Sequence, residues 1–200
     1  MAEFRLTAEL VAKMAARYLD MQNGSEGSIE QRLFAADGLH GDLRQQGYAT
    51  LEQLVEIARW KSGPRTLHHF EGPEVGRDVE TITRLAFSDG ADGVRHRVLT
   101  LINGVSRPTA SAILTIWRPN EFTVIDYRAV RTLLRAGELS SFLDAEDRAD
   151  PWVAQKAMSY NVYVRVCLDL LGRLNKVGIE TISLRDLDRA LWQIDKESVG

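Results

Sequence analysis

The chain has 200 residues, 44% of them hydrophobic and 26% charged, and a formal net charge of -3. These proportions are typical of a soluble globular protein that buries a core without needing disulfides or a bound metal. No apolar run approaches the roughly 20 residues needed to span a bilayer. Cys167 is the only cysteine, which excludes an intrachain disulfide, a four-thiolate zinc site and a four-cysteine iron–sulfur cluster.

Helical periodicity dominates the first half of the chain. Apolar residues from Leu6 to Leu19 recur at helical spacing, and Asn23-Gly24 ends this first predicted helix. The helix is amphipathic and lacks the basic end and apolar stretch of a secretion signal, so we expect a cytoplasmic protein. A weaker segment runs from Ser28 to His40. Thr50 and Gln53 form a capping box that starts a helix running to about Trp60, and Ser62-Gly63-Pro64 ends it.

Helical periodicity also dominates the second half of the chain. Two further helices are predicted for Val75–Ala86 and Gly90–Leu101, and Pro151 suits the first turn of the longest helix, Trp152–Leu174. Ser183 caps a last helix, Leu184–Asp195. Phe122–Ile125 is the one short strand candidate, too isolated to build a sheet. The predicted fold class is therefore all-α.

Charge is segregated along the chain. Twenty of the 25 basic residues are arginine, and five of them, Arg107, Arg118, Arg128, Arg131 and Arg135, fall in one stretch. Four acidic residues follow it: Asp144, Glu146, Asp147 and Asp150. Guanidinium groups suit phosphate, although an arginine-rich composition also follows from a GC-rich genome. The acidic balance argues weakly against a non-specific nucleic-acid coat protein but permits a local basic face.

The most informative segment lies between Val98 and Leu114. One apolar helix stops at a turn containing Gly104, and another starts at once, with Pro108 and Thr109 in its first turn. Such a turn presents unpaired backbone N–H groups and the positive end of a helix dipole, which together can hold a phosphate without reading bases. The alternative is a plain hairpin between two core helices.

This segment resembles the helix-hairpin-helix of the DNA glycosylase superfamily. The resemblance rests on Ile102-Asn103-Gly104-Val105-Ser106, Thr109-Ala110, Ile113-Leu114 and the run from Val124 to Arg131. It implies a two-lobed all-α fold in a single domain of residues 1–200. The hairpin would span about residues 98–115 and the catalytic-loop helix about residues 124–136. Asn103 and Ser106 replace the usual proline and second glycine, which leaves the geometry of the phosphate contact open.

The resemblance also implies a reaction. Family members with a catalytic lysine carry it in the hairpin, and Pro108 occupies that position here. Without the amine no Schiff base forms, so the resemblance implies a monofunctional glycosylase that leaves an abasic site. Asp126 is the candidate catalytic carboxylate, stabilising the charge that develops on the sugar and orienting water. Its alternative role is the N-cap of the helix that follows.

Further site residues follow from the resemblance. The expected DNA-binding residues are Asn103, Gly104, Ser106, Arg107, Thr109, Arg128 and Arg131. A flipped base needs aromatic walls, for which the candidates are Trp60, Tyr48 and Tyr127, and less favoured Trp117, Trp152 and Tyr160. His40, His68, His69 and His96 have no metal-ligand spacing and are predicted to be ordinary surface or loop histidines. We therefore expect no metal and no cofactor.

Three hypotheses follow for function. The first is a monofunctional DNA glycosylase, nucleoid-associated when bound to DNA, that removes a damaged or modified base in base-excision repair or in defence against phage DNA. Its partner is DNA carrying that base, and no obligate protein partner is predicted. The second is a non-catalytic helix-hairpin-helix DNA-binding protein with Asp126 as a cap only. The third is a helical scaffold without salt-sensitive DNA affinity.

Overall fold

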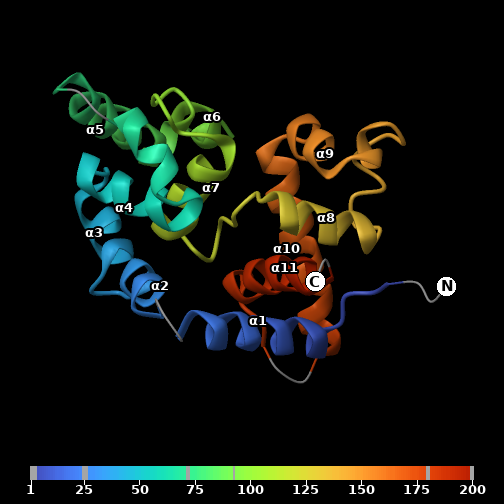
Figure 1. Cartoon of the computed structure of the whole chain (residues 1–200). Helices are drawn as coiled ribbons and strands as arrows, with labels where there is room; N and C mark the ends of the chain where they lie inside the picture. The colour runs from blue at the N-terminus through green and yellow to red at the C-terminus, as the bar shows by residue number, and fades with distance from the viewer. Residues whose placement is uncertain (1–3, 24–26, 71–72, 92, 179–180, 199–200) are drawn as a thin grey trace. The chain divides into compact units, whose positions relative to one another are not determined.

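A computed structural model describes residues 4–23, 27–70, 73–91, 93–178 and 181–198 (Figure 1). These residues contain helices and no strand, so the all-α prediction is confirmed. No helix among them is long and apolar enough to cross a membrane. The chain divides into two compact units, which we name the hairpin unit, residues 26–119, and the terminal unit, residues 1–25 with 120–200.

The hairpin unit is built around helix α7, Arg107–Trp117. Every side chain from Thr109 to Trp117 is buried, and α7 packs against α3, α4 and α6. The other elements of this unit are α2 Gly27–Phe34, α3 Leu39–Gln46, α4 Leu51–Ser62, the 3-10 helix η1 Pro64–Phe70, α5 Pro73–Phe87, the 3-10 helix η2 Asp89–Ala91 and α6 Arg95–Leu99. A helix that is buried all round makes a rigid base for the turn that precedes it.

The terminal unit joins both ends of the chain. Helix α1, Ala8–Asn23, runs along α11, Leu184–Ser198, and α11 packs in turn on α8, Tyr127–Arg135 (Figure 1). The remaining elements are the 3-10 helix η3 Asp147–Ala149, α9 Pro151–Ala157 and α10 Tyr160–Val177. Helix α8 begins at Tyr127, directly after Asp126, and it packs against both α9 and α11.

The capping motifs predicted at the starts of three helices are confirmed. Thr50 and Gln53 form the predicted capping box at the start of α4, and Pro151 lies in the first turn of α9. Ser183 and Asp186 exchange hydrogen bonds at the start of α11. Each of these motifs satisfies helix N–H groups within the segment itself, so that no distant partner is needed to specify it.

The prediction of a single helix over Trp152–Leu174 was wrong. Met158 is extended, with φ -76° and ψ 132°, and separates α9 from α10. Ser159 then caps α10 by accepting a hydrogen bond from the Val162 N–H at 3.3 Å. Because Met158 and Tyr160 are both buried, the apolar periodicity continues through a break in the backbone.

Two other helix predictions were also wrong in extent. The segment Ser28–His40 is divided between α2 and α3, which residues 35–38 separate. Of the predicted helix Gly90–Leu101, only Arg95–Leu99 is α-helical. Phe122–Ile125 forms no strand; it is the connection that enters α8.

Candidate functional site

The hairpin turn follows α6 and has a left-handed glycine at its centre. Gly104 has φ +81°, a conformation that side chains disfavour. A Cβ built on Gly104 would lie 2.3 Å from the Cβ of His69 in η1, so the backbone of the turn lies directly against η1. Glycine is therefore required here twice, for its backbone angle and for its lack of a side chain.

Three backbone N–H groups of this turn donate no hydrogen bond to the backbone among the described residues. The N–H groups of Asn103, Gly104 and Ser106 have no acceptor among the described residues, whereas the N–H of Val105 donates to Ile102 O at 3.0 Å. Residues Thr100 to Ser106 line an open depression of about 530 Å³. Neighbouring N–H donors in a concave turn, next to a helix N-terminus, form an arrangement that binds anions.

The first turn of α7 follows at once. Ser106 is the N-cap, and its hydroxyl accepts a hydrogen bond from the N–H of Thr109 at 3.4 Å. The Thr109 side chain is only 2% exposed and its hydroxyl lies 3.0 Å from that of Ser106. Asn103 and Ser106 are exposed and Arg107 is half-buried. Thr109 therefore supports the cap, while the other residues of the predicted set lie nearer the surface.

His96 connects the two helices of the hairpin. Its Nε2 lies 2.9 Å from the carbonyl oxygen of Arg107, and since a carbonyl can only accept, the ring donates. Burial lowers the pKa of His96 to about 4, so the ring is neutral near pH 7. The prediction that all four histidines are surface or loop residues was wrong here: His96 is 6% exposed and lies within α6.

Burial also lowers the pKa of Arg107, which lies in the first turn of α7. A guanidinium remains protonated despite such a shift. The hairpin unit thus brings together Asn103, Gly104, Ser106, Arg107 and Thr109, five of the predicted DNA-binding residues, around one turn.

In the terminal unit, Asp126 is the N-cap of α8. Its Oδ1 accepts a hydrogen bond from the Arg128 N–H at 2.8 Å, and the side chain is half-buried. The capping role considered from the sequence is therefore present. It does not conflict with a chemical role, because a carboxylate has about four acceptor sites on two oxygens.

The segment that leads to Asp126 is held by three buried side chains. Its three consecutive carbonyl oxygens each accept one hydrogen bond: Thr123 O from Tyr160 Oη at 2.9 Å, Val124 O from Tyr163 Oη at 2.9 Å, and Ile125 O from Gln155 Nε2 at 3.0 Å. Burial raises the pKa of the Tyr163 phenol, which keeps it a neutral donor. Irregular backbone is thereby fixed without a strand, and we name this set the carbonyl clamp.

Arg128 and Arg131 are bound to Asp195 of α11. The Asp195 side chain is fully buried and accepts hydrogen bonds from Arg128 Nη1 at 3.1 Å, from Arg131 Nη2 at 2.7 Å and from Arg131 Nε. These bonds raise the pKa of Arg131. Both arginines thus stabilise the unit, and their predicted contact with DNA stays a prediction.

The aromatic candidates separate into buried and accessible rings. Trp117 and Tyr160 are 4% and 5% exposed, so both belong to the core and neither walls an open site. In the hairpin unit the guanidinium carbon of Arg84 lies 4.2 Å from the centre of the Tyr48 ring. The rings of Trp60 and Phe34 pack edge-on, with their centroids 5.8 Å apart. Tyr127 lies in the terminal unit. The contacts of these rings neither support nor exclude stacking on a base, so the base-pocket role of Trp60, Tyr48 and Tyr127 stays a prediction.

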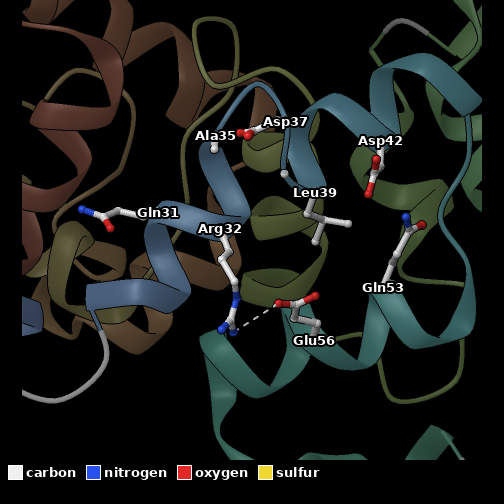
Figure 2. A pocket seen from close by; sticks show the side chains of 9 residues that line it. Gln31, Arg32, Ala35, Asp37, Leu39, Asp42, Gln53 and Glu56 are labelled. Atoms are coloured by element: carbon white, nitrogen blue, oxygen red, sulfur yellow. Dashed lines mark ion pairs between the residues drawn. The ribbon is translucent and has the colours of Figure 1, made fainter.

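A second cavity, of about 550 Å³, lies between α2, α3 and α4 of the hairpin unit (Figure 2). Its charged lining consists of Asp37, Asp42 and Glu56 against Arg32, whose Nη2 lies 3.7 Å from Glu56 Oε1. Carboxylates thus outnumber cations, and the cavity is unsuited to phosphate. The hairpin turn is the better anion site of this unit.

Sequence reasoning missed the carbonyl clamp and Asp195. Gln155 and Tyr163 carried no local signal, because their partners lie 30 and 39 residues away. Comparisons with protein-family models, with curated proteins and with solved structures find no match to this chain.

Proposed function

We propose that the protein is a monofunctional DNA glycosylase, which holds the DNA backbone at the hairpin turn and uses Asp126 to assist hydrolysis of an N-glycosidic bond. The observation that carries the proposal is the set of backbone donors at Asn103, Gly104 and Ser106 in an open depression. Backbone N–H groups suit a ligand whose negative charge is the same at every nucleotide.

The hairpin is built for contact with backbone rather than bases. Its donors are main-chain groups, its glycine excludes a side chain, and His96 and Ser106 fix the start of α7. Such a turn contributes affinity that falls with salt, because phosphate contacts release counterions. It positions the strand and carries no sequence information.

Asp126 supplies the chemistry in this proposal. The carbonyl clamp orders the backbone before it and the α8 hydrogen bond fixes its Oδ1, so the carboxylate is held before substrate binds. As the bond between sugar and base stretches, its negative charge stabilises the positive charge on the sugar, and it orients the attacking water. The expected products are a free base and an abasic site, with no strand cleavage, since Pro108 stands where a lysine amine would attack.

The non-catalytic DNA-binding protein remains the second candidate, because the capping bond of Asp126 is itself a sufficient structural role. The experiment that separates the hypotheses measures two quantities on the same duplexes: affinity as a function of salt, and release of free base from damaged and phage-modified DNA. The glycosylase proposal expects both salt-sensitive binding and release. Binding without release from any duplex indicates the second candidate, and absence of salt-sensitive binding contradicts both.

A further inference from the structure

A stacked pair of aromatic rings joins the first turns of α8 and α9. Tyr127 and Trp152 lie with ring centroids 4.5 Å apart and an interplanar angle of 22°. Trp152 is nevertheless 54% exposed. Tyr127 thus covers part of the indole while the remainder faces solvent.

The supporting ring is itself held in place. Tyr127 Oη accepts a hydrogen bond from Arg131 Nη1 at 2.8 Å, and the Arg131 guanidinium carbon lies 4.9 Å from the centre of the tyrosine ring. Arg131 is in turn bound to the buried Asp195. The pair is therefore ordered before any ligand arrives, so that a ring stacking on it immobilises little further.

We infer that the exposed part of the Trp152 ring is the surface on which an unpaired nucleobase stacks; this inference rests on the proposed function. Tyr127 follows Asp126 directly in the chain, so the stacked pair and the candidate carboxylate both belong to the start of α8. Every nucleobase has a π-face, and stacking on an aromatic side chain needs no particular sequence.

The surroundings of Trp152 favour a base over an apolar peptide. Asp150 and Lys156 flank it on α9 and at its cap, and both are exposed. Val153 is its one large exposed apolar neighbour in that helix, at 42%. A peptide that binds by burial needs a contiguous apolar groove, whereas a base needs one flat ring with polar groups around its edge.

The test uses 2-aminopurine, a fluorescent base whose emission falls when it stacks. A single-stranded oligonucleotide with one 2-aminopurine is titrated with the full-length protein, and the free 2-aminopurine deoxyribonucleoside is titrated in parallel. The variants are Trp152→Ala and Trp152→Phe. Phe142→Ala is the matched control, since Phe142 is an exposed aromatic residue of the same unit, at 45%. Circular dichroism checks that each variant is folded.

The inference expects quenching by the parent protein, a loss of quenching and about tenfold weaker binding for Trp152→Ala, and retention of most of both by Trp152→Phe. Phe142→Ala should behave as the parent. Equal quenching of the free nucleoside supports the stacking site and assigns it to nucleosides instead of a strand.

Three results overturn the inference: no quenching by the parent, Trp152→Ala indistinguishable from the parent, or an equal loss for Phe142→Ala. Failure of the proposed function is seen separately. If quenching depends on Trp152 but the protein releases no base, the stacking site is supported and the glycosylase proposal is contradicted. If the protein releases base without quenching, the glycosylase proposal is supported and the stacking site is contradicted.

Discussion

Lowering the pH should destabilise the hairpin unit through His96. The folded protein holds this ring neutral, with a pKa of about 4, whereas the unfolded chain protonates it near the ordinary value of 6.5. Because the folded pKa lies below the unfolded one, the contribution of His96 to stability is fully present above pH 6.5. It is lost progressively as the pH falls, and the loss is complete below about pH 4.

The magnitude follows from the gap between these two pKa values. At about 1.4 kcal/mol per pH unit, the free energy of unfolding should fall by about 2 kcal/mol between pH 6.5 and 5, and by about 3 kcal/mol once the pH reaches 4. His96→Gln removes the titration and places an amide N–H where Nε2 donates to Arg107 O. This variant should lack the His96 part of the pH dependence.

The assay is urea unfolding of the parent and His96→Gln at pH 7, 6 and 5, followed by tryptophan fluorescence, which includes the buried Trp117 of the hairpin unit. The difference in unfolding free energy between the two proteins should change by about 2 kcal/mol over this range. A difference that does not change with pH, or a His96 proton resonance that titrates near 6.5, would show that the folded protein does not hold this ring neutral.

Three further predictions concern the turn, the buried ion pair and the carbonyl clamp. Gly104→Ala should cost more in unfolding free energy than Gly47→Ala, by about 1 kcal/mol or more, because both glycines have positive φ but only Gly104 faces a close neighbour. Asp195→Asn should destabilise the protein by about 3 kcal/mol in urea unfolding, since it removes the buried charge partner of two arginines; a loss below about 1 kcal/mol would contradict a structural role. Tyr163→Phe removes one clamp bond, to Val124 O, and should cost about 1 kcal/mol and slow base release with DNA affinity unchanged; an unchanged release rate would show that the clamp does not serve the chemistry.

Signals confined to a few residues were predictable from the sequence. The Thr50 capping box, the first-turn Pro108 and the turn at Gly104 all follow from backbone chemistry within one turn. The all-α class follows for the same reason, since helical periodicity is a local property. Asp126 as a cap was also visible from its position before Tyr127.

Features that depend on distant partners were not predictable. The sequence gives no sign that Asp195 binds Arg128 and Arg131, because it lies 67 and 64 residues further along the chain. The sequence predicts His96 to be a surface or loop residue, because a single helical turn does not reveal what covers it. The break at Met158 was hidden because Val153, Ala157, Tyr160 and Val164 recur at helical spacing across it, and such spacing does not register continuity of the backbone.

The proposed role of Asp126 in base release is measured by the single-turnover rate at which free base leaves the DNA. Asp126→Asn keeps a good N-cap and removes the charge. Asp144→Asn is the matched control, because Asp144 Oδ1 also accepts a backbone hydrogen bond in the terminal unit, from the Asp147 N–H at 2.8 Å. On any duplex that the parent protein cleaves at the glycosidic bond, Asp126→Asn should slow release by about 100-fold or more and Asp144→Asn should leave it unchanged. Equal rates for Asp126→Asn and the parent would contradict the account and leave Asp126 as a helix cap alone.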